Sequence, residues 1–183
     1  KARELGAKNT QFRNPNGLDE EGHFTTAYDL ALITRAALRN PVFAEIVSTK
    51  RKTISNGEES YGRVLSNHNK LLSLYSGCDG VKTGFTKKTG RCLVSAATKN
   101  HVQAIAVTLN APDDWNDHMR MLDYAFEHYQ ARPLVVKNMV IKTIPVKNGD
   151  ATELKLLSDG EFYLTLENKE GLDRVKLEYD VPE

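Results

Sequence analysis

The chain has 183 residues, of which 25 are basic, 24 are acidic and 40% are hydrophobic. Its formal net charge of +1 provides no long-range electrostatic field that would favour nucleic acid or an anionic membrane. No apolar run approaches the length of a membrane span. The five histidines are scattered, without the spacing of a zinc site, so we expect no bound metal.

The N-terminal residues predict the end of a helix followed by a long loop. Residues 1–10 resemble a helix that ends near Gly6 or Asn9, because both residue types favour C-terminal helix positions. Residues 11–24 contain Asn-Pro, Asn-Gly and a further glycine, which predict successive turns. We therefore expect the first complete helix only after this loop.

Two helices are predicted next, over residues 25–40 and 41–47. Thr25 or Thr26 is the expected N-cap of the first, and Asp29 would complete a capping-box-like pair with Thr26. Its buried stripe is expected to comprise Leu30, Ile33, Ala37 and Leu38. The second helix would begin at a proline, which favours the first helical position.

The middle of the chain predicts antiparallel strands. Asn56-Gly57 is typical of a two-residue hairpin turn, here between polar strands that we expect to be exposed. Three further strands, over residues 78–86, 91–98 and 101–110, are predicted to form an antiparallel meander.

The two cysteines, Cys78 and Cys92, are predicted to lie on adjacent strands of this meander. If the turn centres on Lys88, then Gly84 faces Cys92, and Cys78 lies about six residues further along the ladder. At about 3.4 Å per residue, that separation exceeds the Cα limit for a disulfide. We therefore predict that the two thiols are not bonded to each other.

The strongest helical pattern covers residues 112–133 and is predicted to stop at Pro133. Its apolar residues recur at spacings of four and three, namely Trp115, Met119, Leu122, Phe126 and Tyr129. Asp113, Asp114 and Asp117 suggest a cation site, but a helix N-terminus attracts carboxylates by itself, so we favour a structural role.

The pattern changes after this helix. Short alternating segments separated by turn residues predict four strands, over residues 135–146, 153–159, 161–168 and 174–181. They indicate a second, all-β unit that is small for an independent core.

Lys82-Thr83-Gly84 places an ammonium, a hydroxyl and a missing side chain on a strand that is otherwise suited to burial. A lysine in a strand is usually a solvated edge residue. A phosphate-binding loop is excluded by residue order, because Val81 precedes Lys82 and a strand follows. The remaining interpretation is an anion pocket beside an active-site cleft, where the Phe85 N–H points at a reacting carbonyl.

Lys-Thr-Gly is one of three signatures of penicillin-binding proteins and serine β-lactamases. Its surroundings, "GCDGVKTGFTKKTGRCLVSAAT", resemble the low-molecular-mass penicillin-binding proteins, the D-alanyl-D-alanine carboxypeptidases. The stretches "ARELGAKNTQFRNPNGLDEEGHFTTAYDLALI", "NHNKLL" and "MLDYAFEHY" resemble the same family in the same order. The resemblance implies an α/β fold, with a β-lactamase/transpeptidase-like antiparallel sheet flanked by helices (residues 1–132) followed by part of a small all-β domain (residues 133–183).

The resemblance also implies roles for five consecutive residues. Lys82 would be a catalytic residue that supplies positive charge to the cleft and hydrogen-bonds the network around the nucleophile, and Thr83 would bind the terminal carboxylate of the substrate. Gly84 would let the peptide run alongside the strand, the Phe85 N–H would be an oxyanion-hole donor, and Thr86 would help to hold the substrate.

The implied substrate is a peptidoglycan stem peptide that ends in D-Ala-D-Ala, with β-lactams as inhibitors and no cofactor. The implied location is the bacterial cell envelope outside the cytoplasm, with membrane association through a segment beyond this chain.

Two of the family's three signatures are missing here. No serine has a lysine three residues later, no Ser-x-Asn occurs, and no serine has a histidine partner at a recognisable spacing. We therefore expect the nucleophile and its lysine base upstream of Lys1, in an N-terminal remainder that also contributes part of the core. This chain alone should then be inactive.

Alternatives remain at two levels. The chain could be a catalytically inactive penicillin-fold module that binds peptidoglycan or a partner protein, whereas a β-lactamase is disfavoured by the β-rich tail. His68, which precedes Asn69 near the cleft-lining strand, could reach the substrate, but we favour a role in loop packing.

Overall fold

The computed structural model describes residues 1–55, 62–173, 175, 176 and 178. It divides the chain into two compact units, one of residues 1–99 with 103–126 and one of residues 100–102 with 127–183. The turn predicted at Asn56-Gly57 lies outside the described residues. Among the residues that the structure describes, no helix is long and apolar enough to cross a membrane.

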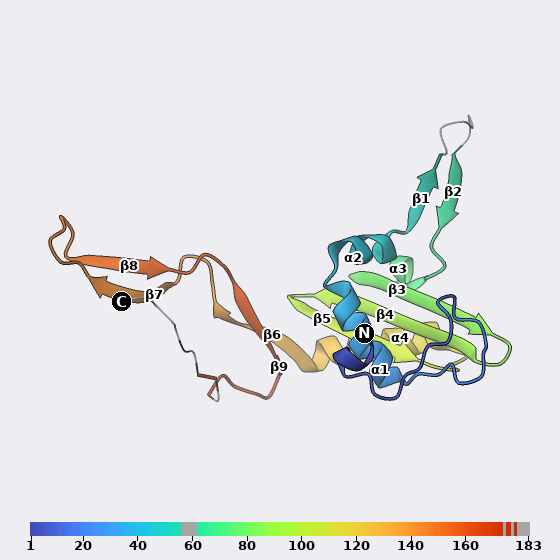
Figure 1. Ribbon diagram of the computed structural model, residues 1–183. Coiled ribbons are helices and arrows are strands. Elements are labelled where there is room, and N and C mark those ends of the chain that lie inside the picture. Colours follow the sequence, from blue (N-terminus) through green and yellow to red (C-terminus); the bar gives the residue numbers. More distant parts are fainter. Residues whose placement is uncertain (56–61, 174, 177, 179–183) are drawn as a thin grey trace. The chain divides into compact units, whose positions relative to one another are not determined.

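The first unit is built on the predicted meander (Figure 1). Strands β3 (Cys78–Thr86), β4 (Gly90–Lys99) and β5 (Val102–Thr108) form one sheet in the order β3-β4-β5. Within the antiparallel β3–β4 pair, Gly84 faces Cys92 and Thr86 faces Gly90, so the turn centres on Lys88 as predicted. The edge position of β3 leaves one side of this strand without a strand partner in the described part of the chain.

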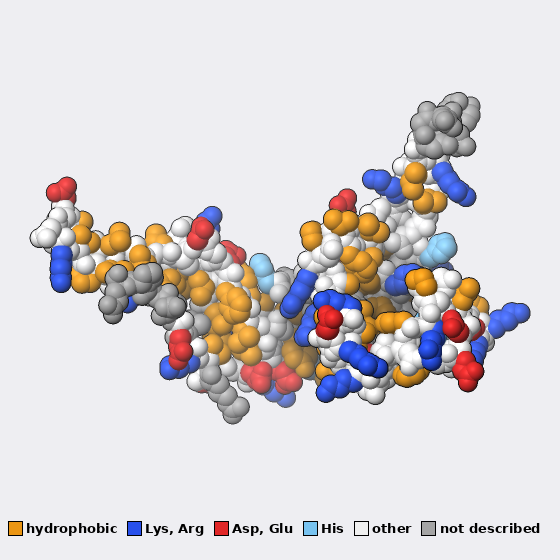
Figure 2. All heavy atoms as spheres, in the orientation of Figure 1, with side chains coloured by type: hydrophobic (Ala, Val, Ile, Leu, Met, Phe, Trp, Pro, Cys, Tyr) orange, Lys and Arg blue, Asp and Glu red, His pale blue; other side chains and the backbone are white. Residues whose placement is uncertain are grey.

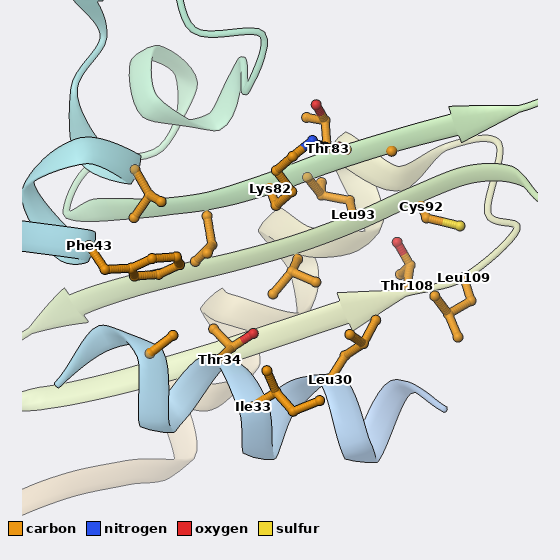
Figure 3. Close-up of a pocket in the computed structure, with 15 residues that line it drawn as sticks. Leu30, Ile33, Thr34, Phe43, Lys82, Thr83, Cys92, Leu93, Thr108 and Leu109 are labelled. Atoms are coloured by element: carbon orange, nitrogen blue, oxygen red, sulfur yellow. Dashed lines mark hydrogen bonds between the residues drawn. The ribbon is translucent and has the colours of Figure 1, made fainter. Parts of the chain in front are cut away.

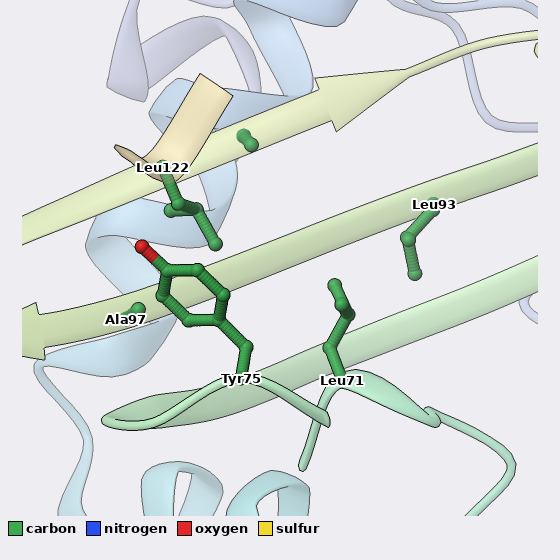
Figure 4. Close-up of a cluster of buried hydrophobic side chains, with 6 residues drawn as sticks. Leu71, Tyr75, Leu93, Ala97 and Leu122 are labelled. Atoms are coloured by element: carbon green, nitrogen blue, oxygen red, sulfur yellow. The ribbon is translucent and has the colours of Figure 1, made fainter. Parts of the chain in front are cut away.

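Helices α1 (Ala27–Leu38), α2 (Pro41–Ser48) and α3 (Leu71–Leu74) belong to the same unit, as does α4 (Asp114–His128) except for its last two residues. Alternating residues of β4 contribute to two different hydrophobic clusters, as the two-residue period of a strand requires. The first cluster comprises Leu71, Tyr75, Leu93, Ala97, Ala106 and Leu122 (Figure 4). The second comprises Val81, Val94 and Ala96, with Leu30, Leu38, Phe43 and Val47 from α1 and α2 packed against it.

This arrangement confirms the expected fold class of an antiparallel sheet flanked by helices. Each fully buried leucine, such as Leu122 at 1% exposure, contributes about 1.5–3 kcal/mol to stability.

The start of α1 uses half of the predicted capping box. Thr26 is the N-cap, and its Oγ1 accepts a hydrogen bond from the Asp29 N–H at 3.1 Å. The buried Asp29 carboxylate instead accepts from the Asn9 N–H and the Thr10 hydroxyl, both at 2.7 Å. Asp29 therefore ties the start of the preceding loop to the helix.

The chain opens on a 3₁₀ turn, Arg3–Leu5, rather than on a longer helix. Gly6 ends it in the left-handed region at φ 86°, which is the C-terminal position expected from the sequence.

A hairpin of β1 (Arg51–Ile54) and β2 (Arg63–Ser66) extends from this unit, with Ile54 opposite Arg63. All the residues of both strands are exposed, as predicted. Apolar side chains also gather on the surface of α2 (Figure 2), where Val42 and Ile46 are more than half exposed.

The prediction that α4 continues to Pro133 is wrong. The helix ends at His128, and β6 (Tyr129–Val135) begins at the next residue, with Tyr129 opposite Glu167 of β9 (Phe162–Glu167). Pro133 occupies the strand beside an irregularity in the register, where a missing N–H is tolerated. Pairing with a distant strand, which the local pattern cannot reveal, therefore sets the helix end.

The second unit contains two separate strand pairs, β6–β9 and β7–β8. The single strand predicted over 135–146 is interrupted, because Asn138 adopts φ 65° between the end of β6 and β7 (Val140–Pro145). Strand β8 (Glu153–Leu157) follows. Most of the last predicted strand lies outside the described residues. The domain boundary expected at 132/133 stays a prediction.

Candidate active site

The residues singled out from the sequence lie along the edge strand β3. Lys82, Gly84 and Phe85 are exposed, whereas Thr83 and Thr86 are half-buried. An exposed strand edge carries unpaired backbone N–H and C=O groups, and an extended peptide can add to such an edge as a further strand. The sequence-predicted residues therefore occur where a peptide has access to the backbone.

The Lys82 side chain bends along its own strand (Figure 3). Its Nζ donates a hydrogen bond to the Thr83 carbonyl at 2.5 Å. Within the described residues, Lys82 forms no ion pair with a carboxylate. Because an ammonium group has three donors, this one retains both its charge and donor capacity for an anion.

Packing within the first unit does not require a glycine at position 84. A Cβ added there would lie 3.8 Å from the Cys92 Cβ, which is ordinary van der Waals contact. The backbone at Gly84 is also not in the left-handed region that favours glycine. Neither packing within the chain nor backbone conformation therefore explains the glycine at this position.

Thr86 ends the strand in a small polar network. Its Oγ1 accepts a hydrogen bond from the Thr89 N–H at 3.0 Å and donates one to the Asp19 carboxylate at 3.0 Å. The neighbouring residue, Phe85, is 69% exposed.

A pocket of about 360 Å³ lies between α1, α2 and the sheet (Figure 3). Lys82, Thr83 and Gly84 form part of its lining. The rest is largely apolar and comes from Leu30, Ile33, Thr34, Ala37, Phe43, Val47, Val81, Cys92, Leu93, Val94, Thr108 and Leu109. Strand β3 therefore borders a hydrophobic pocket as well as open solvent.

His68 does not take the role expected for it, whereas its neighbour Asn69 is buried. The His68 side chain is exposed, so the loop-packing role favoured for it is wrong. Asn69 is 3% exposed instead, and its Oδ1 accepts from the Leu71 N–H at 3.1 Å. The Asn69 Nδ2 is buried without a hydrogen-bond partner among the described residues.

One serine does have a histidine partner, which the sequence spacing did not indicate. The Ser95 hydroxyl lies 2.5 Å from His118 Nδ1, and the Thr108 hydroxyl lies 2.9 Å from His118 Nε2. Ser95 and His118 are both 0% exposed. Burial lowers the pKa of His118 to about 4, against an opposing effect of Asp114 and Asp117. A buried pair cannot reach a substrate, so this network is structural.

The aspartates at the start of α4 have internal partners. Asp114 is buried and pairs with Arg91 at 2.6 Å, and the Asp113 carboxylate accepts from the Asn116 amide at 2.7 Å. Asp117 lies 3.6 Å from an arginine one turn later. These contacts agree with the structural role favoured for the three carboxylates. Among the described residues, no group of three or more histidine, cysteine or acidic side chains could hold a metal ion.

The fold and the exposed Lys-Thr-Gly edge strand define a transpeptidase-like domain, and solved structures support this class. The chain matches a D-alanyl-D-alanine carboxypeptidase from Francisella tularensis with a TM-score of 0.66, at 25% identity, over 91% of this chain and 53% of that chain. It matches penicillin-binding protein 5 from Haemophilus influenzae with a TM-score of 0.66, at 27% identity, over 92% of this chain and 49% of that chain.

Sequence comparison identifies the family. Residues 1–113 match the peptidase S11 family, described as D-alanyl-D-alanine carboxypeptidase. The D-alanyl-D-alanine carboxypeptidase DacF of Bacillus subtilis is 36% identical over 182 residues, covering 97% of this chain and 46% of DacF. DacC of Escherichia coli is 32% identical, over 85% of this chain and 38% of DacC. The chain belongs to the S11 family of D-alanyl-D-alanine carboxypeptidases, and it spans about half the length of these curated relatives or less.

Proposed function

We propose that this chain supplies the substrate-binding strand of a serine-type D-Ala-D-Ala carboxypeptidase that acts on peptidoglycan stem peptides. The observation that carries this proposal is Lys82-Thr83-Gly84 on an open strand edge, in a chain of the S11 family. The names of the relatives support the reaction, because each is called a D-alanyl-D-alanine carboxypeptidase.

The proposed roles follow from the groups that the edge presents. The Thr83 hydroxyl donates to the terminal carboxylate of the substrate, and the Lys82 ammonium stabilises the same negative charge. Gly84 lets the substrate backbone approach the strand, which explains a glycine that the chain's own packing does not require. The Phe85 N–H donates to the carbonyl oxygen on which negative charge develops, and Thr86 borders the next part of the peptide.

The proposed reaction is acyl transfer through a serine ester. The serine oxygen attacks the carbonyl of the penultimate D-alanine, the peptide C–N bond breaks, and the terminal D-alanine leaves with the proton taken from the serine. Water then attacks the ester, releases the shortened peptide and returns a proton to the serine. No metal or organic cofactor enters this balance.

The nucleophile of this reaction lies outside the chain in our proposal. The sequence contains no Ser-x-x-Lys, and Ser95, which does contact a histidine, is fully buried. The apolar pocket beside Lys82 is the place where a segment from the N-terminal remainder would complete the core. The chain alone is therefore proposed to be inactive, and the intact protein to act in the cell envelope, outside the cytoplasm.

A fluorescent penicillin tests the proposal, because its ring opens on the same nucleophile and leaves a covalent adduct. We expect the intact protein to give a labelled band and this chain alone to give none, since losing the nucleophile costs several powers of ten in rate. An intact protein that binds peptidoglycan without labelling would instead support the inactive penicillin-fold module. Labelling of the chain alone would mean that one of its own serines is the nucleophile.

A further inference from the structure

A second groove, of about 340 Å³, lies between α2 and the exposed hairpin of β1 and β2. Its apolar lining comes from Ile46 of α2, Ile54 of β1 and Leu65 of β2. Each of these three residues is at least 45% exposed, so the chain itself leaves their apolar surface in contact with solvent. The groove shares no lining residue with the pocket beside Lys82, and it is therefore separate from the candidate active site.

The register of the hairpin mixes cationic and aliphatic side chains on one face. Lys52 lies opposite Leu65, and Ile54 lies opposite Arg63. Residues directly opposite each other, and residues two apart on one strand, share a face of a sheet. Two cations and two aliphatic side chains therefore occupy the same face, and three of the four line the groove.

The basic side chains of this region have no acidic partner within the described residues. Four exposed cations belong to the hairpin or adjoin it, namely Lys50, Arg51, Lys52 and Arg63. Glu45 is the acidic residue of the groove lining, whereas the glutamates at positions 58 and 59 lie outside the described residues. The chain's net charge of +1 thus conceals a local excess of positive charge beside the groove. Figure 2 shows basic and apolar side chains together on the hairpin.

We propose that this groove, which we call the basic groove, binds an anionic phospholipid at a membrane surface. Arg51 and Lys52 bind the phosphate, and hydrocarbon of the lipid lies against Ile46, Ile54 and Leu65. Cations beside exposed aliphatic side chains are the composition of protein surfaces that lie in the interface of an anionic bilayer. The proposal concerns a surface apart from the edge strand and does not depend on the proposed reaction.

Other occupants fit the basic groove less well. A second copy of the chain would bring the same unpaired cations together across a two-fold contact, which is unfavourable. A protein partner is usually anchored by aromatic side chains as well as arginine, and none of the described lining residues is aromatic. An anionic lipid supplies both the negative charge and the hydrocarbon that the lining lacks.

Sedimentation of the intact protein with lipid vesicles tests the proposal. The vesicles contain phosphatidylcholine alone or equal parts of phosphatidylcholine and phosphatidylglycerol. We expect Lys52→Gln with Arg63→Gln to weaken binding to the anionic vesicles by roughly ten- to thirtyfold, because each basic residue near such a surface contributes about fivefold. Lys8→Gln with Arg35→Gln is the matched control, since it removes one exposed lysine and one exposed arginine without a described ion pair from the same unit. The control should bind within about twofold of the wild type, and binding of the wild type should weaken as salt is added.

A second measurement separates the basic groove from any other lipid-binding segment of the intact protein. Ile54→Trp places a fluorophore in the groove, and Leu18→Trp places one at a residue that is 62% exposed outside it. Brominated phospholipid in the anionic vesicles quenches a tryptophan that enters the bilayer interface. We expect the fluorescence added by Ile54→Trp to be quenched and that added by Leu18→Trp to stay unchanged. Urea unfolding midpoints equal to that of the wild type would show that the variants are folded.

The outcomes decide between lipid and other ligands. Equal losses of vesicle binding in the two double variants would overturn the proposal, as would equal affinity of the wild type for neutral and anionic vesicles. Absence of quenching in a folded Ile54→Trp protein would overturn it as well. Binding of soluble polyglutamate that depends on Lys52 and Arg63, without binding of anionic vesicles, would assign the groove to an acidic protein instead. Penicillin labelling takes no part in this test, so its failure leaves the proposed function intact.

Discussion

Two regions of the first unit combine hydroxyl groups with a basic side chain, and they differ in access to solvent. At the edge of β3, Lys82 is exposed and its ammonium group makes one described hydrogen bond, to a backbone carbonyl. Around His118, both ring nitrogens lie within hydrogen-bond distance of hydroxyls, those of Ser95 and Thr108, and the ring is fully buried. Both regions contain similar residue types, so residue type alone does not identify a binding site. What distinguishes them is access to solvent and the hydrogen-bonding groups that remain free to bind a ligand.

The largest expected difference between the two regions is in how each makes the free energy of unfolding depend on pH. His118 has a pKa of about 4 in the folded state because of burial, against an ordinary value of 6.5 in the unfolded chain. Between these values the unfolded state binds a proton that the folded state does not. Stability from this group is therefore complete above about pH 6.5 and decreases as pH falls towards 4, by up to about 3 kcal/mol.

Urea unfolding of the intact protein at a series of pH values between 4 and 7.5 measures this effect. His118→Asn, which cannot titrate, should flatten the dependence of the unfolding free energy on pH. Lys82→Met, at the exposed region, should leave it as in the wild type. Identical pH slopes for the wild type and His118→Asn would contradict the assignment.

The next largest effect concerns the exposed edge of β3. Thr83→Val removes a charge-assisted hydrogen bond to the substrate carboxylate, worth about 1.5–3 kcal/mol. Acylation of the intact protein by carboxylate-bearing penicillins should slow by roughly ten- to a hundredfold. The unfolding free energy should change little, since the Thr83 hydroxyl has no described hydrogen bond within the chain. Stopped-flow acylation and urea unfolding give the two numbers, and an unchanged acylation rate would remove Thr83 from the site.

Ser95→Ala should produce the reverse pattern and a smaller effect. It leaves the buried His118 Nδ1 without its 2.5 Å partner, which costs about 1–2 kcal/mol of unfolding free energy. The acylation rate should stay within about twofold of the wild type, because Ser95 is 0% exposed. A much lower acylation rate in a folded Ser95→Ala protein would mean that the buried network around His118 takes part in the reaction.

The smallest expected effect is that of oxidation. Cys92 faces Gly84 and Cys78 faces Ala97, so the thiols lie on separate rungs of the β3–β4 ladder, and both are free. Burial also raises the pKa of the Cys78 thiol, which makes the thiolate scarcer. A non-reducing peptide map should contain no Cys78–Cys92 link. Finding that link would overturn the register of the strand on which the whole comparison rests.

Much of the site could be predicted because it depends on neighbours in the sequence. The alternation of the strand residues and the short turn at Lys88 set the β3–β4 register, which places Lys82, Thr83 and Gly84 on one strand. Thr26 was likewise expected as a helix cap, because capping joins groups three residues apart. The roles of these residues towards a ligand stay predictions.

The features that the sequence did not reveal join residues that are far apart along the chain. The end of α4 depends on pairing between Tyr129 and Glu167, and no local signal marks that partner. The contact between Asp19 and Thr86 spans 67 positions, and the Ser95–His118 contact spans 23. Each was missed because helix, strand and turn patterns describe only a few neighbouring residues.

The sequence by itself therefore determined the strand that carries the Lys-Thr-Gly motif, the turn that follows it and the family resemblance. Only the tertiary structure decided which polar groups are exposed to solvent and which are buried. Ser95 and Lys82 lie on facing strands of the same sheet, yet helix packing buries one and the edge position exposes the other. The physical reason is that local geometry fixes where a side chain starts, whereas burial and hydrogen bonding depend on segments that folding brings together.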